Sequence, residues 1–207
     1  VLSRIRPGVG RLRDELEAAA QRDVLAVVAG KNKDELFDDT TADVFIGTEA
    51  VLHRCRRIDV VAFLDFDSEL LAPRYQASEQ AMALIAKAAR LVGIRERGGR
   101  IILQTSLPDN DVVLAAVAGN PGILSQAELA RREMLDFPPV SALAVIEGEG
   151  GGAFATSLTA MGGITVVAHR ERWLVRASSH DVLTHAFMNT ERPAHSKIRI
   201  EVDPPRI

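Results

Sequence analysis

The sequence contains one cysteine, Cys55, which excludes an internal disulfide and a zinc site built from cysteines of this chain. No apolar run reaches the roughly 18 residues that a membrane-spanning helix needs. The formal net charge is -3, so the chain also lacks the basic excess of a protein that coats nucleic acid. We therefore expect a globular, cytoplasmic protein without a membrane segment.

Lysine is scarce as well, because 21 of the 25 basic residues are arginine. The apolar fraction of 47% and the charged fraction of 26% are ordinary for a globular protein and exclude a disordered tail. The chain begins with Val1-Leu2-Ser3-Arg4, without an initiator methionine or a signal-peptide pattern. We therefore expect it to be part of a longer protein.

The first half of the sequence alternates between helical and strand patterns. Apolar spacing predicts helices over 9–20 and 77–92, and short apolar runs predict strands over 23–29, 44–46, 60–64 and 100–104. Strands that alternate with helices and long connections favour parallel pairing, so we expect an α/β layer with a parallel sheet.

The second half follows a different pattern. Apolar stripes between 108 and 135 predict two helices, separated by the turn at 119–122 and ended by Phe137-Pro138-Pro139. Beyond them, strands over 142–146, 164–168, 172–177 and 197–202 alternate with helices over 154–161 and 181–188. This β-α-β-β-α-β order is typical of an α+β, ferredoxin-like domain.

Two glycine-containing motifs suggest nucleotide binding, but neither is complete. Gly30-Lys31 follows a strand, yet a phosphate loop would need glycine where Leu25 stands and serine or threonine where Asn32 stands. The stretch Gly148–Ala153 matches G-x-G-x-x-A, with Glu171 about 20 residues on, as in a dinucleotide site. The hairpin that follows favours a simple turn there, and the dinucleotide interpretation stays as an alternative.

Charged residues supply the remaining candidates. Asp65 and Asp67 end a strand and carry oxygen ligands that suit Mg²⁺, or they simply solvate the strand end. Arginine forks suit phosphate oxygens, and arginines gather in two clusters that are either phosphate contacts or solvated loops. The clusters comprise Arg54, Arg56 and Arg57, and Arg95, Arg97 and Arg100.

Several stretches, in order, resemble the second helicase lobe and C-terminal region of the primosomal protein N′ (PriA) family of replication-restart helicases. They are Arg6–Gly10 with Arg13–Leu16, Ala42–Thr48, Leu64–Asp67, Gly99–Thr105, Glu128–Arg132 with Phe137–Pro139, and Ile200–Pro204. The resemblance implies a RecA-like lobe over 1–108, a helical connector over 109–135 and a ferredoxin-like C-terminal domain over 136–207. It also implies that Gly47, Thr48, Asp65 and Asp67 are remnants of a nucleotide-binding edge.

The sequence departs from this family where the chemistry of ATP hydrolysis would lie. The family's arginine-finger helix ends in Gln-Val-Ala-Gly-Arg-Ala-Gly-Arg, and the two arginines correspond here to Leu91 and Ile94. An arginine finger contributes about 10³–10⁵ to the rate of phosphoryl transfer, and Arg90 is displaced by about 100° around the helix. The loop after Thr48 has also lost the family's Lys-Gly-His-Asp-Phe-Pro.

The resemblance therefore predicts a DNA-binding replication-restart protein that recognises stalled or branched forks, or single strands, and recruits replisome or single-strand-binding proteins. No cofactor is expected in this chain, because the family's ATP, Mg²⁺ and zinc sites would lie mainly upstream. Three alternatives remain open: the C-terminal half of an active ATP-dependent helicase, a dinucleotide enzyme that uses Gly148–Ala153, and a scaffold that binds only proteins.

Overall fold

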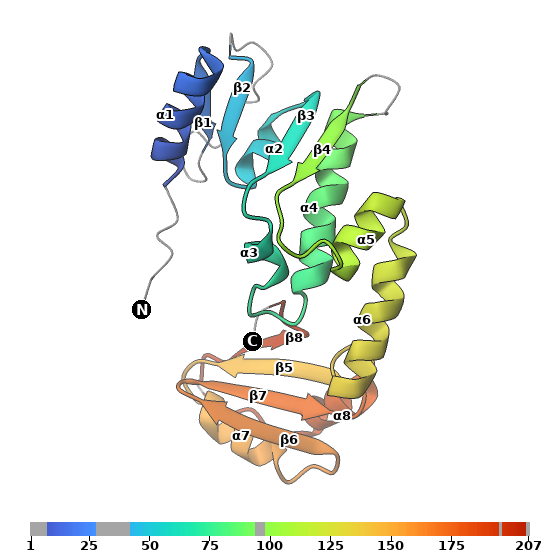
Figure 1. Cartoon of the computed structure of the whole chain (residues 1–207). Helices are drawn as coiled ribbons and strands as arrows, with labels where there is room; N and C mark the ends of the chain where they lie inside the picture. The colour runs from blue at the N-terminus through green and yellow to red at the C-terminus, as the bar shows by residue number, and fades with distance from the viewer. Residues whose placement is uncertain (1–7, 28–41, 94–97, 195, 206–207) are drawn as a thin grey trace, which may run out of the picture. The chain divides into compact units, whose positions relative to one another are not determined.

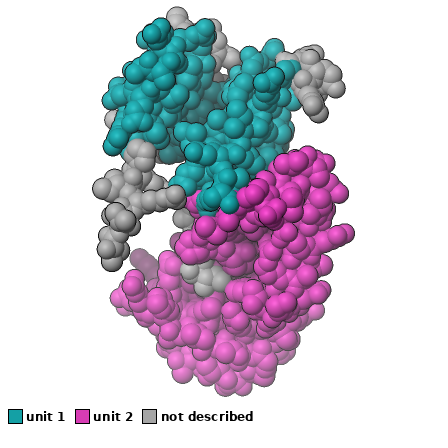
Figure 2. Space-filling view, in the orientation of Figure 1, with its two compact units in different colours: residues 1–67, 82–106 teal, residues 68–81, 107–207 magenta. Residues whose placement is uncertain are grey.

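The computed structural model describes residues 8–27, 42–93, 98–194 and 196–205. These ranges contain eight helices and eight strands in a mixed α/β arrangement with parallel and antiparallel pairing (Figure 1). They divide into two compact units: unit 1 is 1–67 with 82–106, and unit 2 is 68–81 with 107–207 (Figure 2). Within the described ranges, no helix has the length and apolar character to cross a membrane.

Unit 1 contains short strands that pair in parallel. Strand β1 (Val24–Val27) pairs with β2 (Val44–Gly47), and β3 (Val60–Phe63) pairs with β4 (Arg100–Leu103). The helices are α1 (Val9–Ala20), α2 (Ala50–Arg54) and the part of α4 (Ala77–Val92) from residue 82 on. The predicted strands and long helices lie where expected, whereas α2 has five residues and is too short to show a helical period.

The predicted parallel pairing is confirmed, but the described residues form two separate two-stranded parallel sheets and not a single sheet. Strands of a parallel sheet are normally covered on both faces. Here Val60 of β3 is 48% exposed and Ile102 of β4 is 53% exposed, so one face of this pair is open. The other face packs against α2 and α4 through the cluster of Leu52, Val61, Ala88 and Val92.

Unit 2 contains an antiparallel sheet with two helices on one face. The strands are β5 (Ala142–Glu147), β6 (Ile164–His169), β7 (Arg172–Ala177) and β8 (Arg199–Val202), in the order β6-β7-β5-β8. Helices α7 (Gly151–Leu158) and α8 (His180–Asn189) follow β5 and β7, which gives the predicted β-α-β-β-α-β order. Ser179 caps α8 by accepting a hydrogen bond from Val182 N.

The core of unit 2 lies between this sheet and its helices. One cluster joins alternate residues of β5 and β7 to Phe154, Ala155 and Leu158 of α7 and to Leu183 and Ala186 of α8. Side chains of a strand alternate between faces, so the other residues of β5 and β7 form the second face of the sheet. Helix α7 begins three residues earlier than predicted, within the glycine-rich stretch.

The rest of unit 2 comprises α5 (Asp111–Ala118), α6 (Gly122–Leu135) and the segment 68–81, which includes most of α3 (Asp67–Leu70). Arg132 of α6 pairs with Glu79 and donates to Pro138 O at 2.7 Å, and its guanidinium lies 5.4 Å from the ring of Tyr75. The rings of Tyr75 and Phe137 stack at 5.2 Å. These contacts hold the segment 68–81 against α6 and the Phe-Pro-Pro turn. The predicted domain boundaries at 108 and 135 stay predictions.

Candidate functional site

Gly47 and Thr48 mark the point where β2 enters α2. A side chain on Gly47 would place its Cβ 1.9 Å from Val27 O, so the pairing of β1 with β2 requires glycine here. Thr48 O accepts from Val51 N at 3.0 Å, and Thr48 Oγ1 accepts from Ala50 N at 3.5 Å. Both residues are exposed and shape the start of the helix.

Asp65 and Asp67 follow β3, but their side chains lie in different environments. Asp65 is exposed and adopts φ +53°, and its backbone N donates to Gln104 Oε1 at 3.3 Å. Asp67 begins α3, and its carboxylate accepts from Ser106 N at 3.1 Å and from the hydroxyls of Thr105 and Ser106.

This carboxylate therefore joins the ends of β3 and β4. Phe66, which is 1% exposed, completes the junction because its N donates to Gln104 O at 3.0 Å. Among residues 8–27, 42–93, 98–194 and 196–205, no cluster of three or more possible metal ligands occurs.

The described arginines of the two basic clusters lie near the opposite end of the same strand pair, where β3 and β4 begin. We refer to this end as the amino edge. Arg54 ends α2, and Arg56 and Arg57 lie in the loop that leads into β3. Because β3 and β4 pair in parallel with Val60 opposite Arg100, the loop before β3 and the first residue of β4 share one edge. Arg100 N donates to Asp59 O at 3.0 Å, which fixes this juxtaposition.

The side chains at this edge are open to solvent. Arg57 is 72% exposed, and its guanidinium lies 3.9 Å from Asp59, which is itself 79% exposed. Arg56 and Arg100 are also exposed, whereas Arg54 is partly buried. We call Arg56, Arg57 and Arg100 the amino-edge arginines. Arg95 and Arg97 lie outside the described residues, as do Lys31, Ile94 and the motif residues before Gly8.

A further arginine, for which no binding role was predicted, lies at this edge. Ile58 N donates to Leu91 O at 3.3 Å, so the end of α4 lies beside the loop that carries Arg56 and Arg57. Arg90, in the last turn of α4, is exposed. The sequence separates Arg90 from Arg57 by more than thirty residues, and only the packing of α4 on β3 brings the two segments together.

Leu91 occupies a different environment from its neighbour Arg90. It is partly buried and packs against the apolar cluster of Leu52, Val61 and Val92. Successive residues of a helix point about 100° apart, so the exposed Arg90 does not occupy the position of Leu91. Position 91 is therefore part of the packing between α4 and its neighbours.

The glycine stretch of unit 2 is explained by packing. Gly148 has φ +100°, and a Cβ there would lie 2.1 Å from Lys197 O. A Cβ on Gly151 or Gly152 would lie 2.9 Å from the ring of Trp173. The indole therefore occupies the space beside the start of α7, and these contacts give no support to the dinucleotide interpretation.

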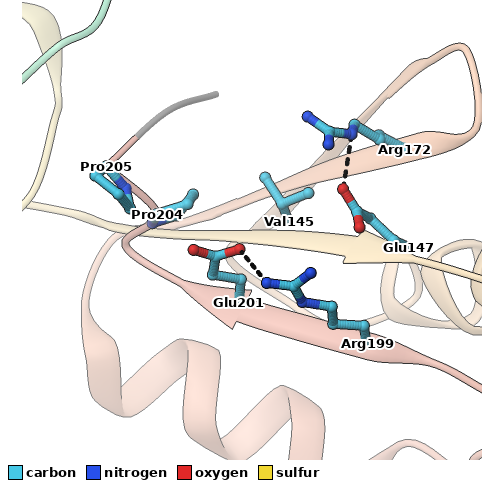
Figure 3. Close-up of a pocket in the computed structure, with 7 residues that line it drawn as sticks. All are labelled: Val145, Glu147, Arg172, Arg199, Glu201, Pro204 and Pro205. Atoms are coloured by element: carbon cyan, nitrogen blue, oxygen red, sulfur yellow. Dashed lines mark hydrogen bonds and ion pairs between the residues drawn. The ribbon is translucent and has the colours of Figure 1, made fainter. Parts of the chain in front are cut away.

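A hollow in unit 2 was not predicted (Figure 3). Its charged side chains form ion pairs with one another, at 2.7 Å between Arg172 and Glu147 and 3.3 Å between Arg199 and Glu201. Val145 lies between the pairs, and Pro204 and Pro205 close one side. The charges cancel within the hollow, so it carries no net charge for a ligand.

Comparison with known proteins finds no matching family model. The chain is 31% identical over 105 residues to the replication restart protein PriA of Chlamydia pneumoniae, which is 50% of this chain and 14% of the relative. It is 29% identical over 113 residues to the same protein of Synechocystis sp., covering 53% and 14%. The Bacillus subtilis protein is 24% identical over 112 residues, again covering 53% and 14%. The match thus spans about one seventh of these relatives.

Proposed function

We propose that this chain, a member of the PriA family, is the C-terminal half of a replication-restart protein that binds DNA without helicase activity. The match to the family covers about half of this chain and a small part of each relative. In this proposal the amino-edge arginines contact phosphates of a stalled or branched fork. Replisome or single-strand-binding proteins are the partners that such a protein recruits.

We also propose a fold family for each unit. We assign unit 1 to a RecA-like second lobe, supported by parallel strands that alternate with helices. We assign the sheet of unit 2 to a ferredoxin-like domain, supported by the strand order β6-β7-β5-β8 with both helices on one face. Residues 109–135 then form the helical connector.

The observation that carries the DNA-binding proposal is the parallel register of β3 and β4. It places Arg56, Arg57 and Arg100 at one edge with exposed side chains, although they lie in two separate parts of the sequence. Phosphate contacts from arginine supply most of the sequence-independent affinity for DNA. The guanidinium of Arg57 lies 3.9 Å from the carboxylate of Asp59, and the arginine side chain still has 72% of its surface exposed.

The proposed lack of helicase activity rests on Leu91. The family resemblance places an arginine finger here, yet the side chain packs in an apolar cluster and has no cationic group. Gly47, Thr48 and Asp67 have structural roles at the strand ends, as their hydrogen bonds and close contacts indicate. This proposal is consistent with a remnant of a nucleotide-binding edge whose residues now stabilise the fold.

The test is fork-DNA binding by the 207-residue chain at several salt concentrations. The double variant Arg57→Gln with Arg100→Gln should bind at least about tenfold more weakly, and its log-log salt slope should fall by about 2, close to 0.9 per phosphate contact. Arg11→Gln is the matched control, since Arg11 is 75% exposed and paired with Glu15 in α1. An unchanged slope, or affinity that does not depend on salt, would overturn the assignment.

A second measurement separates DNA binding from motor activity. The proposal expects no DNA-stimulated ATP hydrolysis from the full-length protein that carries this segment. DNA-stimulated hydrolysis that persists in that protein would favour the active-helicase alternative. Equal affinities for fork DNA and for plain duplex DNA would contradict fork recognition but not the proposed phosphate contacts.

A further inference from the structure

The two outer strands of the unit 2 sheet differ in chemistry. Strand β8 has the sequence Arg-Ile-Glu-Val and is followed within two residues by Pro204-Pro205. Charged side chains and proline at a sheet edge are features that prevent pairing with another strand. Strand β6 reads Ile-Thr-Val-Val-Ala-His over 164–169, without Asp, Glu, Lys, Arg or Pro. It therefore lacks these protective features.

Strand β6 also has residues that suit pairing. Four of its six residues are β-branched, which favours a pleated, half-buried surface. Val167 is 52% exposed, and Thr165, Ala168 and His169 are exposed as well. Only β7 pairs with β6 among the described residues, so the other edge of β6 keeps its outward backbone groups available.

Val167 is the end of an apolar row that crosses the sheet. In the register of the strands, Val145 of β5 lies opposite Leu174 of β7, and Leu174 lies opposite Val167. The row begins at Val145, which is 7% exposed, and ends at the exposed Val167. On the helix-covered face, the parallel row of Ala144, Val175 and Val166 likewise ends at β6. Both rows would continue if a further strand were added.

We propose that β6 pairs antiparallel with β6 of a second copy of this chain, with Val167 opposite Val167 of the other copy. A two-fold axis at this residue keeps each face of the sheet continuous and makes a sheet of eight strands. Thr165 then lies opposite His169, Val166 opposite Ala168, and Arg170 opposite Ile164. No like charges meet, and the apolar row of the outer face runs unbroken from one copy to the other.

The contrast with β8 explains why the assembly stops at two copies. A dimer formed through β6 has β8 at both of its ends, and β8 carries Arg199 and Glu201 with side chains 72% and 44% exposed. These charges and the following prolines disfavour further edge pairing. The pairing therefore produces a closed dimer, independent of whether the chain binds DNA.

The oligomeric state of the 207-residue chain tests this inference. Sedimentation equilibrium should show a monomer-dimer equilibrium, and Val167→Lys should weaken the dimer about tenfold or more, because lysine on an edge strand opposes pairing. Val202→Lys is the matched control, since Val202 lies on β8 and is 49% exposed. It should leave the dimer unchanged, and thermal unfolding should show that both variants fold.

A cysteine cross-link tests the register. Directly opposed side chains of an antiparallel pair have Cβ atoms close enough for a disulfide after a small adjustment. Val167→Cys should therefore form a disulfide dimer under mild oxidation and Val202→Cys should not, while the native Cys55 is buried. A chain that stays monomeric at all concentrations, equal effects of the two lysine variants, or cross-linking at Val202 instead of Val167 would overturn the proposal.

Discussion

Unit 1 and unit 2 differ in how they bury apolar side chains. In unit 2, antiparallel strands of four to six residues and two helices enclose Phe154, Ile146 and Leu158, each 0% exposed. In unit 1, four-residue strands pair in parallel, one face of β3 and β4 is open, and α1 has no buried residue. Unit 2 therefore has the more completely buried core, whereas the amino-edge arginines of unit 1 lie on a strand pair with one open face.

The two units can be observed separately. The only tryptophan, Trp173, lies in β7 of unit 2, where its ring contacts the glycines of α7. The only cysteine, Cys55, lies in unit 1 and is 6% exposed. Tryptophan fluorescence therefore reports on unit 2, and the reactivity of the thiol reports on unit 1.

The largest expected effect is the loss of stability caused by a substitution in the core of unit 2. Phe154→Ala should lower the free energy of unfolding by about 4 kcal/mol, because it removes a fully buried aromatic ring that stacks on Phe187. Urea unfolding followed by Trp173 fluorescence measures it. Met188→Ala, at a residue 80% exposed, should change stability by less than about 0.5 kcal/mol. Equal effects would contradict a core at this position.

The next largest effect is the loss of stability caused by a substitution in the ion-pair network that holds the segment 68–81. Arg132→Met should cost about 3 kcal/mol, because it removes the cation beside Glu79 and leaves the buried Glu128 paired with the more exposed Arg131. Arg131→Met is the control on the same helix, where the arginine side chain is 47% exposed, and it should cost less than about 1 kcal/mol. Hydrogen exchange over 68–81 should rise only in the first variant; if both variants raise it equally, the segment is not held by Arg132.

A smaller effect is expected in unit 1. Gly47→Ala should destabilise this unit by about 1–3 kcal/mol, because the added Cβ collides with Val27 O. Cys55 should then react faster with a thiol reagent while Trp173 fluorescence stays unchanged. Gly10→Ala, where a Cβ meets nothing within 4 Å, should not accelerate the reaction. A change in Trp173 fluorescence would show that the units are not independent.

The smallest effects are pH-dependent and differ between the units. Burial raises the pKa of the Cys55 thiol from its ordinary 9.0, and burial raises the pKa of Tyr75 from its ordinary 10.0. In each case the folded state holds the proton more tightly than the unfolded chain. The stability contribution is complete below the unfolded pKa and is lost as the pH rises through the higher folded pKa.

Unit 1 should therefore begin to lose stability near pH 9.0 and unit 2 only above pH 10.0. Cys55→Ala should flatten the first decline, and Tyr75→Phe should flatten the second, as measured by urea unfolding between pH 7 and pH 11. Identical pH curves for the parent chain and both variants would show that these two groups do not contribute.

The sequence predicted most strands and long helices correctly because their apolar runs and helical periods are local. The strands over 44–47, 60–63 and 172–177 lie within a residue of their predicted ranges. The start of α7 was missed because Gly151 and Gly152 suggest a turn, whereas the ring of Trp173 packs against them. Local sequence cannot show a contact with a strand twenty residues away.

The candidate site was predictable only in part, for the same reason. The family resemblance pointed to Gly47, Asp65 and Asp67, but not to the hydroxyls of Thr105 and Ser106 that bind the Asp67 carboxylate. The gathering of Arg57 and Arg100 at one edge depends on the register of β3 and β4, which no local pattern specifies. Arg90 was assigned no binding role because its position beside Ile58 arises from helix packing alone.

The packing of Leu91 limits which side chains suit this position. Leu91 is partly buried and packs against the apolar cluster of Leu52, Val61, Ala88 and Val92, so an arginine here would place its guanidinium beside apolar neighbours. Introducing a cation at this position by a single substitution should therefore cost stability in unit 1. An engineer who wants an arginine here would have to change the neighbours in α2 and β3 as well.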